Sequence, residues 1–425
     1  MKDLLVIHDI GELVTASGPD RLRQGKEMEA LEILHQAYIV IQNGKIKEIG
    51  IDSSYEKYRG EAEFVSAKGK LVTPGLIDSH THLVHAGSRE HEIKQKLAGV
   101  SYLDILKQGG GILSTVKSTR DADFSNLYLQ AEKSLKRMAE YGITVVEAKS
   151  GYGLNKETEI KMLEVTKALQ EHHSMQIIPT FLGAHALPEE YLHNRRGYLD
   201  LLKEVMKEVK VRNLATYCDV FCEEGVFSLE ESRKLLEWAK ELGFGIRIHA
   251  DEMSSLGGAG LAAKLAAASA DHLLKASDAD LVLLGKAGIP CTVLPLTSFY
   301  LNKDFARARF MIDNNCGLTV ATDYNPGSSP SENIQLAMQM AFLKTYMKPE
   351  EVLTAVTINA AVSLGLEKSK GSLQVGKDAD FVIFDCSNLD YLFYHFGINQ
   401  VQDVYIQGKR IVKDQKYIGG NDEFN

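Results

Sequence analysis

The middle of the chain alternates short apolar runs with longer stretches whose apolar residues recur at helical spacing. Amphipathic stretches such as 127–142 (LYLQAEKSLKRMAEYG) and 230–245 (EESRKLLEWAKELGFG) separate the runs. The eight runs of strand length are 76–82, 143–150, 176–185, 217–224, 245–252, 269–274, 291–297 and 318–325. Continuous apolar strands that alternate with helices are typical of a parallel sheet covered by helices. Eight such units predict a (β/α)₈ TIM barrel, with an open doubly wound sheet as the alternative.

Both ends of the chain have a different pattern, in which short alternating strands are separated by turn residues. Asn43-Gly44 is a strong hairpin signal between two such strands. The strand-like segments are 4–10, 37–50 and 63–72 at one end, and 371–385 and 400–412 at the other. A small antiparallel sheet needs a partner layer to be stable. We therefore predict one discontinuous β-sandwich domain, residues 1–70 plus 365–425, with the barrel domain, residues 71–364, inserted between its halves.

The composition restricts the class of protein. Apolar residues make up 44% of the 425 residues and charged residues 25%, as in ordinary soluble globular proteins. No run approaches 18 apolar residues and the N-terminus lacks signal-peptide features, so neither a membrane span nor secretion is expected. A net charge of −9 argues against nucleic acid as the partner. Five scattered cysteines without C-x-x-C favour free thiols in the cytoplasm. A homodimer is the default expectation.

Ionisable side chains gather at the carboxyl ends of the predicted strands, which is the rim where α/β barrels carry their active sites. The residues at these ends are His80, His82, Lys149, Tyr152, His185, Glu223, Glu224, His249, Asp251, Glu252, His272, Asp323 and Asn325. The clustering predicts an active site at this rim.

A metal site is the first chemistry that this rim suggests. His80 and His82 alternate to one face of a strand, about 6.6 Å apart. Alone, each candidate has an ordinary structural explanation, since histidines pack in cores and aspartates cap turns. Together with His249 and Asp323, they form a four-ligand set. The run 217–224 contains no lysine that could bridge two metals, so we predict one divalent ion. Three imidazoles and one carboxylate suit both zinc and iron.

Glu252 and His272 are the predicted proton-transfer residues. A carboxylate three residues beyond a ligand histidine can lie beside the activated water. Asp251 competes for this role because it shares the face of His249 on strand alternation. For His272 the structural alternative is a packed histidine that the preceding Asp271 orients.

Two features suggest a binding site for a carboxylate. The segment 329–332 (SPSE) has the pattern of a capping box with proline at the first helical position, which predicts a helix start. The N–H groups of that helix start, with Gly327 and Ser328 just upstream, could hold an anion. Arg89 could grip a carboxylate in bidentate fashion. A well-capped helix without a ligand and a solvated arginine are the structural alternatives.

Several of these segments resemble the amidohydrolase superfamily. The stretch 73–82 (TPGLIDSHTH), HADE at 249–252, SADHL at 269–273 and ATD at 321–323 resemble its motifs, and 371–385 resembles its small sandwich domain. Longer stretches are similar to a branch of the superfamily that acts in histidine degradation. These are 85–116, 148–154 (AKSGYGL), 181–188 (FLGAHALP) and 323–333 (DYNPGSSPSEN).

The resemblance implies metal-dependent hydrolysis of the cyclic amide of 4-imidazolone-5-propanoate to N-formimino-L-glutamate. The substrate would be a small molecule with a carboxylate tail. By the same resemblance, zinc or iron is held by His80, His82, His249 and Asp323. The residues implied in substrate binding are Arg89, Tyr102, Tyr152, His185 and Glu252, with Asn325, Gly327 and Ser328 on the product carboxylate.

Two other functions remain open on the sequence. A nucleobase-type deaminase of the same superfamily would use the same four ligands, but its substrate has no carboxylate for Arg89 and the segment 327–328 to bind. A non-catalytic scaffold on the same barrel would be expected to lack ligands, and all four are present.

Overall fold

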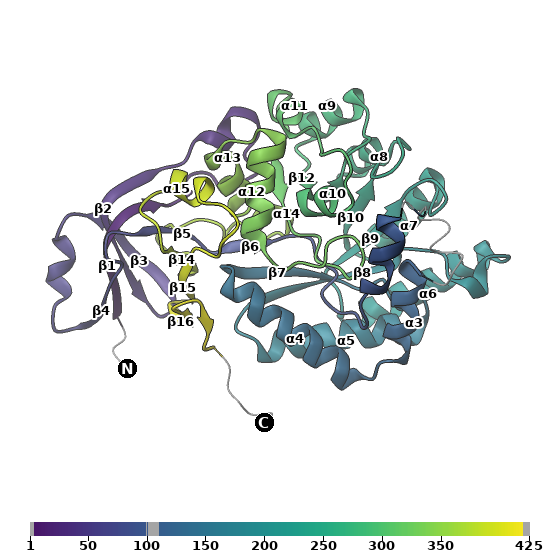
Figure 1. Ribbon diagram of the computed structural model, residues 1–425, viewed down its shortest axis with the longest axis horizontal. Coiled ribbons are helices and arrows are strands. Elements are labelled where there is room, and N and C mark those ends of the chain that lie inside the picture. The colour runs from purple at the N-terminus through teal and green to yellow at the C-terminus, as the bar shows by residue number, and fades with distance from the viewer. Residues whose placement is uncertain (1–3, 99, 101–109, 420–425) are drawn as a thin grey trace.

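The computed structural model describes residues 4–98, 100 and 110–419. Figure 1 shows a helix-covered barrel beside a sheet in which the purple N-terminal and yellow C-terminal segments lie together. The predicted β-rich ends therefore meet in space, and the rest of the chain lies between them in sequence.

Eight parallel strands form the barrel, in the sequential order β6 to β13. Their bounds are β6 Leu76–Asp78, β7 Ile143–Lys149, β8 Gln176–Ala184, β9 Tyr217–Cys222, β10 Gly245–Ala250, β11 Ser269–His272, β12 Cys291–Val293 and β13 Leu318–Val320. The barrel closes beyond β6 and β13, where Thr81 and Tyr324 form a parallel bridge. Each of the eight predicted runs contains a barrel strand, although β12 ends at Val293 and the second half of the run 291–297 enters helix α10. The closure favours the barrel over the open sheet.

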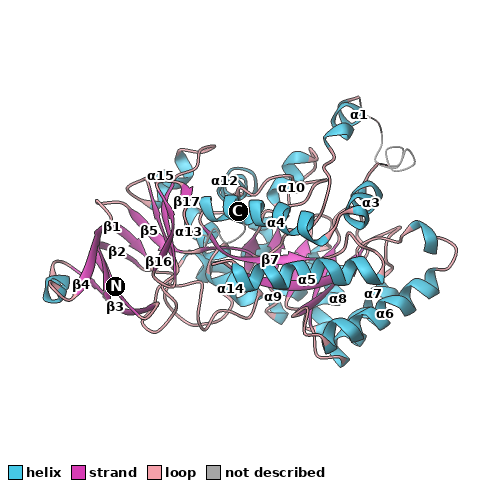
Figure 2. Cartoon of the chain, turned by 90° about the horizontal axis from the view of Figure 1, so that it is seen from below, coloured by secondary structure: helices cyan, strands magenta, loops and turns pink. Residues whose placement is uncertain are grey.

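Most of the helices lie around the outside of these strands, whereas α15 lies beside the end sheet and α1 projects away from the barrel (Figure 2). Their bounds are α1 Ile93–Leu97, α3 Ile112–Asp121, α4 Phe124–Glu140, α5 Lys156–His172, α6 Arg195–Val211, α7 Leu229–Glu241, α8 Gly258–Leu265, α9 Asp278–Ala287, α10 Pro295–Tyr300, α11 Ala308–Asp313, α12 Ile334–Thr345, α13 Pro349–Ala355, α14 Ile358–Ser363 and α15 Leu389–Tyr394. Short 3₁₀ helices cover Gly25–Glu29, Ser54–Tyr58, Glu90–Glu92 and Glu189–Tyr191.

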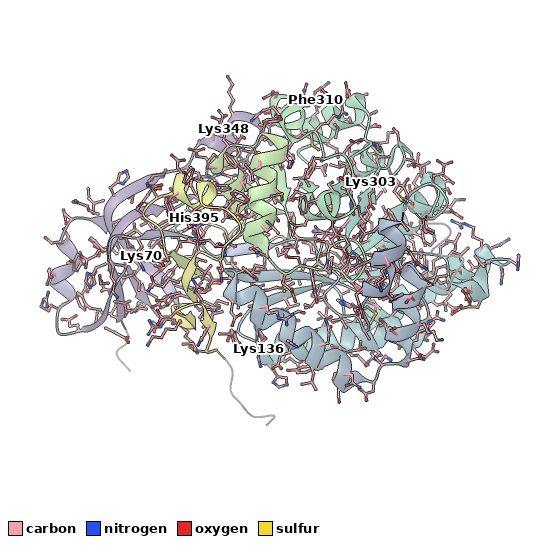
Figure 3. All side chains as sticks on the ribbon, viewed as in Figure 1. Lys70, Lys136, Lys303, Phe310, Lys348 and His395 are labelled. Atoms are coloured by element: carbon pink, nitrogen blue, oxygen red, sulfur yellow. The ribbon has the colours of Figure 1, made fainter. Side chains whose placement is uncertain are left out.

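Helix α4 shows how the pattern produces this arrangement. Asp123 caps it by accepting a hydrogen bond of 2.8 Å from Asn126 N. Leu127, Ala131 and Leu135 recur every four residues and are fully buried against the barrel. Lys136 lies on the opposite, outer side of the helix (Figure 3). The helix is therefore held mainly by its buried stripe, as the amphipathic spacing predicts.

The chain ends form a nine-stranded sheet in the order β17-β16-β15-β14-β5-β1-β2-β3, with β4 beside β1. The bounds are β1 Leu4–Val14, β2 Ile33–Gln42, β3 Lys45–Ile51, β4 Ala62–Ser66, β5 Leu71–Pro74, β14 Phe381–Phe384, β15 Val401–Ile406, β16 Lys409–Lys413 and β17 Lys416–Tyr417. The sheet is mostly antiparallel, but β1 runs parallel to β4 and β5. Strand β5 lies beyond the predicted boundary at residue 70, so the sheet extends a few residues further.

This sheet folds over on itself, although its hydrogen bonds are continuous. The hairpin turn at Gly44 lies against Gln407, and a Cβ on Gly408 would meet Ile41 Cγ2 at 2.8 Å. These turns belong to opposite parts of the strand order, so the two parts of the sheet face each other. Asn43 and Gly44 have φ of 53° and 75°, as the predicted Asn-Gly hairpin requires.

Two expectations from composition can be compared with the structure. None of the helices in the described part of the chain has the length and apolarity that a bilayer crossing requires. All five cysteines are free and buried, as their scattered spacing suggested.

A buried amide helps to hold the N-terminal segment against the barrel, and this contact generates a stability prediction. Asn359 accepts a hydrogen bond of 2.8 Å from Arg23 N and donates to Arg23 O at 2.9 Å and Leu318 O at 3.0 Å. Asn359→Leu leaves three buried backbone groups without these partners, so we expect a loss of about 3 kcal/mol or more in unfolding free energy. For a chain of this size the thermal midpoint falls by about 3 °C, measured by calorimetry. As a control, Asn388→Ala removes an exposed helix cap at about 1 kcal/mol. Equal shifts for both variants would contradict this role of Asn359.

Candidate metal centre and active site

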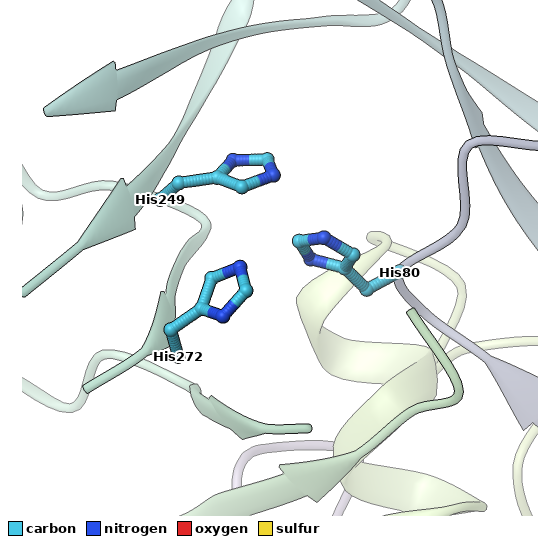
Figure 4. A group of neighbouring side chains, drawn as sticks. All are labelled: His80, His249 and His272. Atoms are coloured by element: carbon cyan, nitrogen blue, oxygen red, sulfur yellow. The ribbon is translucent and has the colours of Figure 1, made fainter. Parts of the chain in front are cut away.

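Four histidines and one aspartate converge at the carboxyl end of the barrel. His80 and His82 follow β6, His249 lies in β10, His272 ends β11 and Asp323 follows β13, and each is at most 3% exposed. Figure 4 shows the rings of His80, His249 and His272 turned toward one space. The strand β6 ends at Asp78. His80 and His82 therefore stand on the loop beyond the strand and not in the strand itself.

These side chains form two overlapping groups that could hold a metal ion. One group is His80, His249 and His272, and the other is His80, His82 and Asp323, with the ligand atoms of each group within 4.8 Å of one another. The structure thus brings together all four predicted ligands, with His80 shared between the groups. It also places His272, predicted as a proton-transfer residue, close enough to be a fifth candidate.

The buried atoms that face this space fit a cation. Within the described part of the chain, His80 Nε2, His249 Nε2 and Asp323 Oδ1 are buried and make no hydrogen bond. Asp323 Oδ1 lies 3.5 Å from His80 Nε2 and 3.5 Å from His82 Nε2. Burial holds the pKa of His80 and of His82 well below the ordinary value, which favours the neutral imidazole that binds metals. Burial also raises the pKa of Asp323 to about 6, as expected for a buried carboxylate without a cation.

Two aspartates that were not among the predicted site residues lie behind the histidines. Asp271 Oδ2 is 2.8 Å from His80 Nδ1, and Asp219 Oδ2 is 3.0 Å from His249 Nδ1. The sequence had suggested that Asp271 orients its neighbour His272. In the structure Asp271 orients His80 instead. Such carboxylates fix the tautomer of a ligand histidine. A usable signal was present, because Asp219 is an isolated charge inside the apolar run 217–222.

Backbone conformation helps to aim the site residues. His272 and Asp323 have φ of 74° and 53°, in the left-handed region that side chains other than glycine rarely adopt. Thr297 Oγ1 donates a hydrogen bond of 2.5 Å to Asp323 Oδ2. This bond leaves Oδ1 of the same carboxylate directed at His80 and His82.

Glu252 lies beside His272, at the edge of the histidine cluster. Its Oε2 is 3.7 Å from His272 Nδ1. Burial raises the pKa of Glu252 to about 7, and the nearby Glu223 adds to the rise. Glu223 also holds the loop, because its Oε2 accepts hydrogen bonds from Glu252 N at 3.0 Å and Met253 N at 2.9 Å. The structure therefore presents a carboxyl group able to exchange its proton near neutral pH.

Asp251 has a structural role instead. Its carboxylate accepts hydrogen bonds from Leu256 N, Gly257 N and Ala259 N at 2.8 to 2.9 Å, at the start of α8. These N–H groups occupy both of its oxygens, so Asp251 caps this loop and helix. The structure thus favours Glu252 over Asp251 as the proton-transfer residue.

Two predicted substrate-binding residues flank His82. The ring of His185 stacks on His82 at 4.8 Å with an interplanar angle of 14°, and the ring of Tyr152 lies 5.6 Å from His82. His185 Nδ1 is 3.1 Å from Gly151 O. Both rings therefore line the same side of the metal centre. The third aromatic candidate, Tyr102, lies outside the described residues.

Arg89 lies at the rim with part of its guanidinium already engaged. Its Nε and Nη2 donate hydrogen bonds of 2.9 and 3.0 Å to the buried carboxylate of Glu92. Glu92 also accepts from Gly111 N at 2.7 Å. On the other side, a Cβ at Gly327 would lie 2.0 Å from Arg89 Nη1, so a larger residue there would force the guanidinium to move. The edge of the guanidinium that carries Nε and Nη2 thus binds Glu92, and Nη1 faces the turn at Gly327.

The predicted helix start at 329–332 is wrong. Helix α12 begins at Ile334, and its N-cap is Asn333, whose side chain accepts from Leu336 N. Ser329 Oγ instead donates to Thr322 O at 2.7 Å. A capping box needs its serine free to cap, and here the closing barrel loop takes that hydroxyl.

The anion site expected at that helix start is not built in this way either. The N–H groups of Gly327 and Ser328 donate to Asn325 Oδ1 at 2.8 and 2.7 Å. Asn325 Nδ2 in turn donates to Asp323 O at 2.6 Å. The asparagine side chain thus shapes the turn behind Asp323 and uses the donors that the anion would need.

The comparisons with known sequences agree with one another. The sequence profile of the amidohydrolase family matches residues 71–411. An imidazolonepropionase of Fusobacterium nucleatum is 49% identical over 410 residues, covering 96% of this chain and 99% of the relative. An imidazolonepropionase of Alkaliphilus metalliredigens is 48% identical over 422 residues, covering 98% of this chain and 100% of the relative.

The solved structures that resemble this one are more distant in sequence. An adenosine deaminase from Xanthomonas campestris with bound zinc has a TM-score of 0.71 at 18% identity, covering 97% of this chain and 94% of that one. E. coli guanine deaminase has a TM-score of 0.73 at 15% identity, covering 96% of this chain and 99% of that one. At such identities the likeness concerns the fold alone. The family profile and the near full-length identity to the curated relatives show that this chain belongs to the amidohydrolase family, in its imidazolonepropionase branch.

Proposed function

We propose that this protein is a hydrolase that opens the cyclic amide of 4-imidazolone-5-propanoate to give N-formimino-L-glutamate, a step of histidine degradation. The observation that carries this proposal is 48–49% identity to imidazolonepropionases over nearly the whole chain. The reaction adds water across a carbon–nitrogen bond, and the rim of the barrel holds the residues that such a reaction requires.

A single divalent metal ion, zinc or iron, would be held by His80, His82, His249 and Asp323. The support is the set of buried, unpartnered ligand atoms in the described part of the chain. Bound there, the ion would supply Lewis-acid activation of water and of the ring carbonyl.

Glu252 and His272 move and hold protons in this proposal. Glu252, with its pKa raised by burial to about 7, takes a proton from the attacking water and delivers one to the leaving ring nitrogen. Burial lowers the pKa of His272 to about 4, which keeps its imidazole neutral. A neutral ring still carries one N–H, which can donate to the oxyanion that develops on the ring carbonyl.

Arg89 binds the propionate tail of the substrate. The ion pair with Glu92 fixes the plane of the guanidinium, and Nη1, which Glu92 does not bind, is the nitrogen that would bind the substrate carboxylate. Tyr152 and His185 cover the neighbouring side of the site, against His82. Asn325, Gly327 and Ser328 shape the turn that packs against Arg89.

A deaminase is the alternative that the same metal centre would allow. The deaminases of similar fold share only 15–18% of their sequence with this chain. A direct test is to incubate the metal-loaded protein with freshly prepared 4-imidazolone-5-propanoate and identify the product. We expect N-formimino-L-glutamate without release of ammonia. Ammonia release from purines or pyrimidines, with no turnover of the imidazolone, would instead establish a deaminase.

The cellular compartment and the assembly state are the remaining parts of the proposal. Five free cysteines fit a reducing compartment, so we propose the cytoplasm. A homodimer stays a prediction. We propose that the partners are limited to the small substrate and exclude nucleic acid, in keeping with the net charge of −9.

Metal content provides the first prediction about function. Chelation should abolish hydrolysis, and added zinc or iron should restore it, because the proposed ligands surround a single site. Elemental analysis of dialysed protein is expected to give about one ion per chain. A reproducible value near two would contradict the mononuclear site.

The second prediction about function concerns the proton-transfer residues. Glu252→Gln and His272→Asn are each expected to lower kcat by about 10²-fold or more, the usual cost of losing a general acid or base. Both variants should keep the metal, as measured by elemental analysis. Loss of metal from His272→Asn would show that His272 is a ligand, as its proximity to His80 and His249 allows.

Arg89 provides the third. Arg89→Met should raise the free energy of the transition state by up to several kcal/mol and so lower kcat/KM, because the substrate carboxylate loses its charged partner. Arg89→Lys should fall between Met and the parent, since it keeps the charge but not the fork. A ring analogue without the propionate tail should be a poor substrate that Arg89→Met hardly affects further. If both substrates lose equally, Arg89 supports the loop with Glu92 and does not read the tail.

A further inference from the structure

Five fully buried charged side chains lie beneath the metal centre, inside the barrel. They come from the four strands β7, β9, β10 and β11 and are Glu147, Lys149, Asp219, Arg247 and Asp271. Burying charges in this way is expensive, and apolar side chains of similar size often stabilise a core equally well. Stability alone is therefore a weak reason for this group, which we call the buried charge network.

Lys149 is the donor at the middle of the network. Its Nζ lies 2.8 Å from Glu147 Oε1 and 2.7 Å from Asp219 Oδ2, and 3.8 Å from Asp271 Oδ2. Arg247 is further from the carboxylates, at 3.6 Å from Glu147 and 3.7 Å from Asp271. The guanidinium instead donates to the backbone carbonyls of Ser363 and Ser79, each at 2.9 Å. Lys149 therefore makes the close contacts with the carboxylates.

The network reaches the metal centre through two of its carboxylates. Asp219 Oδ2, the atom that Lys149 contacts, is also 3.0 Å from His249 Nδ1. Asp271 Oδ2 lies 2.8 Å from His80 Nδ1. A carboxylate at Nδ1 holds the ring proton on that side and leaves Nε2 for the metal. The Nε2 atoms of His80 and His249 are among the buried atoms of the described residues that make no hydrogen bond. His249 Nδ1 is at ion-pair distance from Asp219 but is also without a hydrogen bond.

The formal charges of the network also suit a divalent ion. Three carboxylates against two cations leave one net negative charge, and Asp323 adds a second. The same total would balance one doubly charged metal ion, and the interior then contains no uncompensated charge from these groups. The network is thus matched in both geometry and charge to the proposed centre.

We propose that Lys149 is a positioning residue for the metal centre: by fixing Asp219, and at longer range Asp271, it holds His249 and His80 with Nε2 toward the ion. Within the described residues, Lys149 forms ion pairs with Glu147 and the two aspartates and with none of the four proposed ligands, so it acts through the aspartates. This inference rests on the proposed metal-dependent function.

The test is the affinity of the apoprotein for Co²⁺ and Zn²⁺, measured by competition with a chelator, together with the visible spectrum of the Co²⁺ protein. Lys149→Met is expected to weaken the affinity by about 10- to 100-fold, the usual cost of losing a partner behind a ligand, and to change the Co²⁺ spectrum. Lys149→Arg keeps the charge but moves the donor, so its metal affinity should fall between those of the parent and Lys149→Met.

Lys370→Met is the matched control. Lys370 is a nearly buried lysine that pairs with Asp378 and Asp380 in the end sheet, away from the metal centre. Its substitution should lower the thermal midpoint but leave metal affinity and the Co²⁺ spectrum as in the parent. Equal loss of affinity in both methionine variants would mean that general destabilisation is the cause, and would overturn the proposal.

Other outcomes separate this inference from the proposed function. If the parent protein binds no metal, the proposed function fails. If the parent binds the metal and Lys149→Met binds it equally well or more tightly, only the positioning role fails. The effect of Lys149 on metal affinity would then be limited to the repulsion between its positive charge and the ion. If Lys149→Met does not fold, Lys149→Arg carries the test, with a several-fold loss of affinity expected and unchanged affinity overturning the proposal.

Discussion

The structure depends on one constraint, which is that ionisable side chains lie buried inside the barrel, away from solvent. An unpaired buried charge costs several kcal/mol, so every such group needs a partner of opposite charge or a metal ion. Neighbouring strands supply some of the partners: Arg247 on β10 lies 3.7 Å from Asp271 on β11, and His249 on β10 lies 3.0 Å from Asp219 on β9. Further pairings run across the barrel, as between Asp271 and His80. The pairings across the barrel exist only when the barrel is closed, so closing the barrel also completes the site.

Strained backbone at the strand ends is the second structural feature on which the site depends. Asp251, His272 and Asp323 have positive φ, which costs of order 1–3 kcal/mol for such residues when the conformation is unfavourable. Each stands where a barrel strand passes into its loop. Asp251 caps a loop there, and the other two residues face the metal centre. The regular ladder ends at these points, which frees the side chains to turn toward a shared space.

Much of this fold could be predicted from the order of apolar runs. Each run became a barrel strand, and Asn43-Gly44 became the hairpin turn that its residues require. The rim residues were predictable because parallel strands bring their carboxyl ends to one edge. His80 and His82 could be named for that reason, although they lie beyond β6 and not within it.

The remainder depended on contacts between segments that are distant in sequence. The serine of 329–332 matches a capping box locally, but its hydroxyl donates to Thr322 O, and the helix begins later at Ile334, after its N-cap Asn333. Asn325 similarly competes for the N–H groups of Gly327 and Ser328. The pairing of Asp219 with His249 depends on β9 and β10 lying side by side, and only the unusual charge inside an apolar strand indicated it. Local patterns do not carry this information.

The central claim is that four side chains from three separate parts of the barrel hold one ion. The most direct measurement is a crystal structure of the metal-loaded protein with data collected at the absorption edge of the metal. The account predicts one anomalous peak, bonded to His80, His82, His249 and Asp323 at about 2.0–2.2 Å, with His272 outside bonding distance. Two peaks, or a single ion bonded to His272 in place of one of the four, would contradict it.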